Sequence, residues 1–130
     1  MTCQVLEPPD LIRQGLTMAT RICHSRAVAL GWWSDQTGQR IRKNKGELIA
    51  LMHSKLSEAL EGERRGLMDS RLPHRRAAEV ELADLLIRVF DFAGEFGYDL
   101  ADALCEKLAY NDQRGGVTSR SRQFQGGKEF

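Results

Sequence analysis

Apolar residues recur at helical spacing near the start of the chain. In residues 10–30 they fall three or four positions apart, at Ile12, Leu16, Ala19, Ile22, Cys23, Ala27 and Leu30. Such spacing places side chains on one face of an α-helix. We therefore predict a helix over residues 10–30, with Asp10 as its N-cap and Gly31 as its end.

Three further helices are predicted in the same way. They cover residues 46–65, residues 75–96 and a stretch that starts at Asp99. Gly66 and Gly97 follow the first two, and glycine adopts the left-handed conformation that ends many helices. No segment alternates apolar and polar residues convincingly, so we predict no strands. The pattern indicates an all-α four-helix bundle.

The composition is that of an ordinary globular domain. With 130 residues, of which 42% are hydrophobic and 28% charged, we expect one domain over residues 1–111 and a polar, basic tail over residues 112–130. No apolar run approaches the roughly 20 residues of a membrane span, and the N-terminus has no signal-peptide pattern. A net charge of +1 gives no reason to expect a nucleic-acid partner. Three widely spaced cysteines favour a reducing cytoplasm over a disulfide framework.

The predicted third helix carries a narrow charged seam among large apolar side chains. At 100° per residue, five charged residues fall within an arc of roughly 80°. They are Glu81, Asp84, Arg88, Asp91 and Glu95. An ordinary surface helix has the opposite proportions, with a limited apolar stripe and a broad polar face. We therefore expect this helix to be packed on several sides and the seam to have a specific role.

Two pairs of acids lie on successive predicted helices. Glu58 and Glu61 are three residues apart, as are Glu81 and Asp84, and this spacing places each pair on one helix face. If the two helices form an antiparallel hairpin, the pairs can converge. Clustered carboxylates repel each other, and a hard divalent cation relieves the repulsion, so Mg²⁺ or Mn²⁺ fits better than zinc. On the residues alone, solvated acidic faces are an equal alternative.

These segments resemble the MazG-like branch of the all-α nucleoside triphosphate pyrophosphatases. That family carries an E-x-x-E pair, a variable spacer and an E-x-x-D pair. The likeness lies in HSKLSEALEGERRGLMDSRLPHR followed by EVELADLLIRVFD, in EKLAYNDQR, and in a terminal motif at Gly126, Gly127, Lys128 and Phe130. It covers about residues 27–130. A phage-associated and bacterial MazG-like subgroup is especially similar.

The resemblance implies a Mg²⁺-dependent nucleoside triphosphate pyrophosphohydrolase. Such an enzyme cleaves (d)NTP between the α and β phosphates, giving (d)NMP and pyrophosphate. The implied catalytic and metal residues are Glu58, Glu61, Glu81 and Asp84. The implied substrate contacts after the last helix are Lys107, Asn111 and Arg114. Members of this family assemble as dimers or tetramers, so we expect a homo-oligomer that completes the bundle.

One residue departs from the family pattern. The first glutamate of the family pair usually occupies the position of Lys55. Either the working pair is Glu58 and Glu61, one turn on, or a cation has replaced one metal ligand. An ammonium there competes with Mg²⁺ for the carboxylates, which implies a weakened or inactive enzyme. A non-catalytic nucleotide-binding protein of the same fold is therefore an alternative.

Other residues allow two interpretations each. Trp32 and Trp33 can stack on a base, with Trp33 as our predicted substrate contact, or they can seal a core or a subunit contact. The basic loop over residues 40–45 can reach phosphates or lie in solvent, and it also permits a small nucleic-acid-binding protein as a third hypothesis. His53 and His74 lack partners at metal-ligand spacing, so we interpret both as structural.

Overall fold

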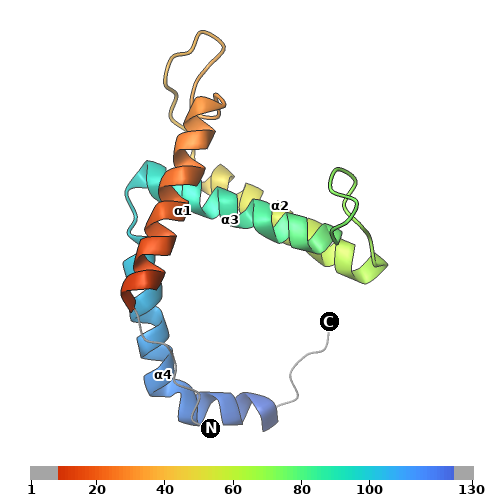
Figure 1. Cartoon of the computed structure of the whole chain (residues 1–130). Helices are drawn as coiled ribbons and strands as arrows, with labels where there is room; N and C mark the ends of the chain where they lie inside the picture. Colours follow the sequence, from red (N-terminus) through yellow and green to blue (C-terminus); the bar gives the residue numbers. More distant parts are fainter. Residues whose placement is uncertain (1–8, 125–130) are drawn as a thin grey trace. The chain divides into compact units, whose positions relative to one another are not determined.

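Helices are the regular secondary structure of the part of the chain that the structure describes. The computed structural model describes residues 9–124, and the side chains of residues 10–114. Its helices are α1 (Pro9–Ala29), α2 (Lys45–Arg65), α3 (Ala77–Phe96) and α4 (Leu100–Phe124) (Figure 1). Within these residues the only β-type pairings are two isolated bridges, Ser34 with Arg40 and Met68 with Arg76. The predicted all-α class with four helices is confirmed.

The described residues form two compact units. Residues 18–98 make up the first, and the described parts of residues 1–17 and 99–130 make up the second. The prediction of one domain over residues 1–111 stays a prediction. No helix in the described part of the chain is long and apolar enough to cross a membrane.

Helices α2 and α3 form an antiparallel hairpin, the main helix packing of the first unit (Figure 1). The side chain of Asn44 caps α2 by accepting a hydrogen bond from the backbone N–H of Glu47 at 3.1 Å. Gly66 and Gly97 end α2 and α3 with φ of 62° and 70°, as the sequence predicted. Gly62 lies against Ala77 and Ala78, so three small residues allow the end of α2 and the start of α3 to approach closely.

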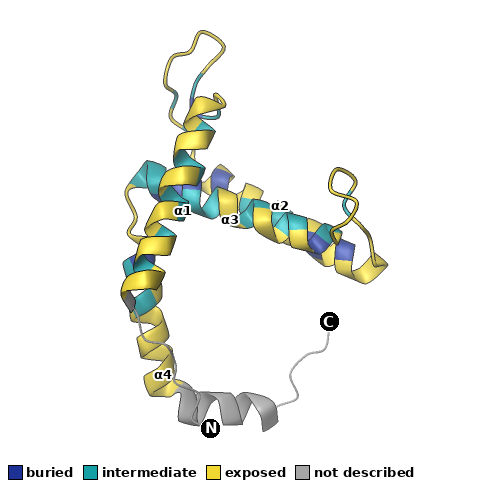
Figure 2. Cartoon of the chain, in the orientation of Figure 1, coloured by how far each residue is buried: buried dark blue, intermediate teal, exposed yellow. Residues whose placement is uncertain are grey.

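The core of this unit is small and aromatic. Trp33, Leu48 and Phe92 are its buried members, and Ala27, Trp32, Met52 and Phe96 pack against them. By contrast, exposed positions run along much of the hairpin, including Leu82, Leu86 and Ile87 on α3 (Figure 2). Within one chain, part of the charged seam of α3 is therefore buried, while part of its apolar surface is exposed. The expected packing of this helix on several sides is not reached.

Two helix boundaries differ from the predictions. Asp10 lies in the first turn of α1 and not at its N-cap, because the helix already begins at Pro9. Asp99 caps α4 as expected, accepting from the backbone N–H of Asp102 at 3.0 Å. However, α4 continues to Phe124, well into the predicted tail. One contact that favours this continuation joins Arg114 to the hydroxyl of Tyr110 one turn earlier, at 3.2 Å. The terminal motif at residues 126–130 lies outside the described residues.

Gly94 lies at a close approach between α1 and α3 within the first unit. A Cβ added there would lie 2.6 Å from Cβ and 2.8 Å from Cγ of His24. We expect Gly94→Ala to lower the free energy of unfolding by about 1–3 kcal/mol, because overpacking forces the two helices apart. Urea denaturation followed by far-UV circular dichroism measures this.

Gly15→Ala is the matched control for Gly94→Ala. It also lies in a helix, but a Cβ there meets nothing within 4 Å. We expect the control to leave stability unchanged or to raise it by up to about 1 kcal/mol through helix propensity. Equal stability of the two variants would contradict the close approach at Gly94.

Candidate carboxylate site on the α2–α3 hairpin

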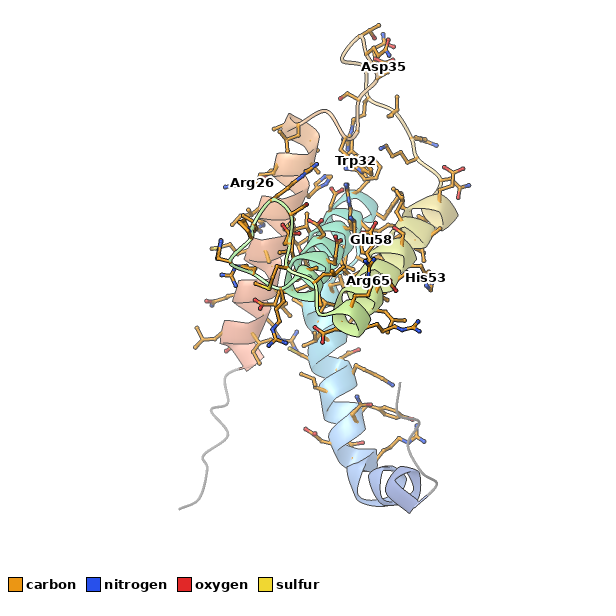
Figure 3. All side chains as sticks on the ribbon, turned by 90° about the vertical axis from the view of Figure 1, so that its right-hand side faces the viewer. Arg26, Trp32, Asp35, His53, Glu58 and Arg65 are labelled. Carbon is orange, nitrogen blue, oxygen red and sulfur yellow. The ribbon has the colours of Figure 1, made fainter. Side chains whose placement is uncertain are left out.

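Three of the predicted site residues meet around a single cation. The ammonium of Lys55 donates hydrogen bonds to Glu58 Oε2 at 2.9 Å and to Glu81 Oε2 at 3.1 Å. It also lies 3.6 Å from Asp84 Oδ2. Lys55 and Glu58 come from α2 and the other two from α3, and Glu58 lies where the two helices run side by side (Figure 3). The predicted convergence of the hairpin's acids therefore occurs for these three carboxylates.

The cluster remains acidic despite its central ammonium. Three carboxylates surround one cation, so the local charge is −2 when all four groups are ionised. The hydrogen bond to Glu58, together with that to Glu81, raises the pKa of Lys55 above its usual range. The same ammonium lowers the pKa of Glu58. Burial, followed by the nearby Glu58, raises the pKa of Glu81. Lys55 is therefore charged at neutral pH, and Glu81 is easier to protonate than an ordinary glutamate.

Glu61 lies apart from this cluster. Its carboxylate is 3.8 Å from the guanidinium of Arg65, one turn further along α2, and both side chains are exposed. Of the two sequence interpretations of Lys55, the geometry matches the one in which the lysine occupies a ligand position. The hairpin brings together Lys55, Glu58, Glu81 and Asp84, while Glu61 remains with Arg65.

The donor chemistry of the cluster suits Mg²⁺, but its arrangement does not. Mg²⁺ takes oxygen ligands at close range and demands near-octahedral geometry. Here the point on which the three carboxylates converge is held by the Lys55 ammonium, which a divalent ion must displace before it can bind. Residues 10–114 contain no set of three His, Cys, Asp or Glu side chains arranged to hold a metal ion. Mg²⁺ at this site stays a prediction.

The predicted substrate contacts on α4 belong to the second unit. Lys107 and Asn111 share a helix face, because α4 continues beyond both. The ammonium of Lys107 and the guanidinium of Arg114 lie 4.7 Å and 5.4 Å from the ring centroid of Tyr110. These cations are thus grouped around one aromatic ring. Their role in substrate binding stays a prediction.

Trp33 lies in the core and is 1% exposed. Its indole N–H donates to both carboxylate oxygens of Asp91, at 2.9 and 3.2 Å, and Asp91 itself is 2% exposed. The structure thus favours the core interpretation of Trp33, while its substrate role stays a prediction. Trp32 is only partly buried, and Lys43 and Arg88 lie 3.4 Å and 3.8 Å from its ring centroid.

A polar network that the sequence analysis missed surrounds Asp91. His24 Nδ1 lies 2.9 Å from Asp91 Oδ1, and its Nε2 lies 3.4 Å from Glu95. Glu95 in turn accepts a hydrogen bond from Arg40 at 2.5 Å. Asp91 and Glu95, the last two acids of the charged seam, therefore contact α1 and the 30–44 connection and hold both against α3. The only sequence signal was the position of Asp91 between large apolar residues.

Comparisons with known proteins bring no relative to this site. No family model, no curated protein and no solved structure matches the chain. The interpretation of the site therefore depends on its own geometry and on the sequence motifs.

Lys55→Met tests the electrostatics of the cluster. At pH 7 we expect the free energy of unfolding of the variant to be about 1 kcal/mol lower than that of the natural chain, which is the scale of a partly exposed ion-pair network. Because Lys55 lowers the pKa of Glu58, the stabilisation is complete above the usual glutamate pKa and is lost as the pH falls through the lowered value. The stability difference should therefore shrink as the pH is lowered from 7 to 3, as measured by urea denaturation.

Lys45→Met is the control for this pH series. Lys45 is an exposed lysine at the start of the same helix, and its ammonium contacts the Tyr98 hydroxyl at 3.2 Å. We expect its stability difference from the natural chain to change little with pH. A difference for Lys55→Met that stays constant between pH 7 and pH 3 would show that the ammonium does not stabilise ionised carboxylates.

Proposed function

We propose that this chain is a nucleotide-binding member of the MazG-like, all-α pyrophosphohydrolase fold, in which the Lys55 ammonium takes the place of a metal ion and turnover is weak or lost. One observation carries the proposal. Lys55 Nζ lies within 3.6 Å of Glu58, Glu81 and Asp84, the three carboxylates at which the family motif implies metal ligands.

The competition between Lys55 and a metal has a physical basis. The ammonium is tethered next to the carboxylates, so it need not be gathered from solution as a divalent ion must be. Displacing it breaks two charge-assisted hydrogen bonds and leaves a cation beside the incoming metal. Both effects lower the metal affinity of the cluster. The ligand class remains the nucleoside triphosphate that the motif implies.

We further propose that the chain acts as a homo-oligomer, as members of the family do. The exposed Leu82 and Leu86 on α3 support this, since a helix rarely leaves large apolar residues in water without a partner. A dimer or tetramer that covers them provides the packing that α3 lacks within one chain.

The second candidate function is an active Mg²⁺-dependent pyrophosphohydrolase. Its support is that three carboxylates from two helices still converge on one point, and that Glu58 and Asp84 remain about half exposed to an ion from solution. Lysine is flexible, so its head group can swing away from the cluster.

One assay on the natural chain separates the two candidates. Pyrophosphate release is measured with dATP, dGTP, dCTP and dTTP, in Mg²⁺ and in Mn²⁺, and nucleotide binding is measured in parallel by calorimetry. Our proposal expects binding with little or no pyrophosphate release. Efficient release by the natural chain favours the second candidate, and absence of binding under all conditions overturns both.

A further inference from the structure

A pocket of about 600 Å³ lies beside the carboxylate cluster in the first unit. Its apolar wall includes Ile22, Leu30, Trp32 and Ile87, and its cationic groups are Arg26 and Arg88. The volume falls within the range of small-ligand sites, roughly 300–1,000 Å³. Asp84 lines the pocket as well as the cluster, so a ligand in the pocket lies next to the hairpin's acids.

The cations at this pocket are available to a ligand. Four other arginines pair with carboxylates, namely Arg13, Arg40, Arg65 and Arg75. Within the described side chains, neither Arg26 nor Arg88 lies within ion-pair distance of a carboxylate. The guanidinium of Arg88 is held 3.8 Å from the ring centroid of Trp32, so its position is already restricted before a ligand arrives.

Three cations, Arg26, Arg88 and Lys43, lie in the pocket lining or at the ring of Trp32, against one lining carboxylate, Asp84. The ammonium of Lys43 lies 3.4 Å from the ring centroid of Trp32, near Arg88. Burial, followed by the charge of Arg88, lowers the pKa of Lys43. The nearest buried acid, Asp91, is already bonded to Trp33 and His24. An anion with a planar apolar part satisfies both features of the site, the cations and the apolar wall.

We propose that this pocket binds a nucleotide without any metal ion, with the base against its apolar wall and the phosphates on Arg26 and Arg88. This proposal rests on the proposed function for its choice of nucleotide over other aromatic anions. It adds that binding depends on guanidinium groups of the pocket, because the Lys55 ammonium holds the carboxylates that a metal needs. Binding is therefore independent of divalent ions.

Calorimetry in the presence of EDTA tests this directly. The four dNTPs are titrated into the natural chain, with the corresponding deoxynucleosides and inorganic tripolyphosphate as partial ligands. We expect a dNTP to bind in EDTA, and each partial ligand to bind about tenfold more weakly or worse, since each uses only one part of the pocket. Absence of dNTP binding in EDTA, or tripolyphosphate binding as tight as that of a dNTP, overturns the proposal.

Three substitutions locate the site. Arg88→Ala and Arg26→Ala are each expected to weaken dNTP binding by about tenfold or more, because each removes a charge-assisted contact to phosphate. Arg88→Lys retains the charge but lacks the planar fork, so its affinity should lie between that of Arg88→Ala and that of the natural chain. Arg71→Ala, an exposed arginine on the 66–76 connection, is the control and should bind as the natural chain does.

Folding effects are separated from binding effects by two measures. Far-UV circular dichroism and thermal unfolding are compared for every variant, and Arg26 is exposed, so its truncation leaves the core intact. If both alanine variants fold and bind dNTP as tightly as Arg71→Ala, the pocket is not the site. The Trp32→Phe variant should retain binding but lose any fluorescence change that the nucleotide causes.

This proposal and the proposed function can fail independently. Pyrophosphate release after Lys55→Glu tests the carboxylate cluster, whereas dNTP binding in EDTA tests the pocket. Release by the variant with no binding in EDTA by the natural chain removes the pocket proposal alone. If dNTP binding in EDTA depends on Arg88 but Lys55→Glu releases no pyrophosphate, the pocket proposal is supported. The proposal that the carboxylate cluster is a pyrophosphohydrolase site is then overturned.

Discussion

Lys55→Glu is expected to turn the chain into a Mg²⁺-dependent pyrophosphohydrolase. The substitution removes the ammonium that now bonds Glu58 and Glu81, and it adds a fourth carboxylate at the point where all of them converge. A metal ion stabilises the charge that develops in phosphoryl transfer by several kcal/mol. We therefore expect pyrophosphate release from at least one dNTP to rise about 100-fold or more over the natural chain.

Two further variants separate ligand gain from cation loss. Lys55→Gln removes the ammonium without adding a carboxylate, so its activity should rise much less than that of Lys55→Glu. The double variant Lys55→Glu with Glu81→Gln removes one carboxylate from α3 and should return to the level of the natural chain. Equal gains for Lys55→Gln and Lys55→Glu would show that the fourth carboxylate is not a ligand.

Thermal unfolding provides a readout that does not depend on turnover. Without metal, Lys55→Glu places four carboxylates together with no cation, so its melting temperature in EDTA should fall below that of the natural chain. Mg²⁺ should restore it, since a ligand at 100 times its dissociation constant stabilises by about 2.7 kcal/mol. The natural chain should respond little to Mg²⁺. If Lys55→Glu neither binds Mg²⁺ nor releases pyrophosphate, this would contradict the proposal that Lys55 occupies a ligand position of a metal site.

The helices could be predicted from the sequence because their signals are local. Apolar spacing and the glycines at positions 66 and 97 define α2 and α3 within a few residues. Convergence of Glu58, Glu81 and Asp84 followed from helical geometry once a hairpin was assumed. The end of α4 was missed, because the polar residues after Asn111 form a helix without the apolar spacing on which the prediction depended.

The membership of the cluster was only partly predictable. Two steps of three residues turn a helix by about 120°, so Lys55 and Glu61 point in quite different directions while Glu58 lies between them. Only the three-dimensional structure shows that the face of α2 with Lys55 lies against α3 and that Glu61 pairs with Arg65. The contact between His24 and Asp91 joins residues 67 positions apart, and no spacing rule identifies such a pair.

Asp91→Ala is expected to be the most destabilising single truncation in the first unit. Asp91 is 2% exposed and accepts hydrogen bonds from the indole N–H of Trp33, while His24 Nδ1 lies within hydrogen-bond distance. Removing the carboxylate leaves the buried indole donor without its acceptor and opens a cavity beside Phe92. Unsatisfied buried donors cost about 1–3 kcal/mol each, so we expect a loss of about 3–5 kcal/mol in the free energy of unfolding.

Urea denaturation followed by tryptophan fluorescence and circular dichroism measures this loss. Asp35→Ala is the control, because Asp35 also accepts hydrogen bonds within the 30–44 connection, from Thr37 and Gln39, but lies exposed at its tip (Figure 3). The control should lose much less stability. Asp91→Asn retains one acceptor oxygen and should fall between the two. If Asp91→Ala were as stable as Asp35→Ala, the network would not be what anchors Trp33 to α3, nor what holds the neighbouring Trp32 of the proposed nucleotide pocket.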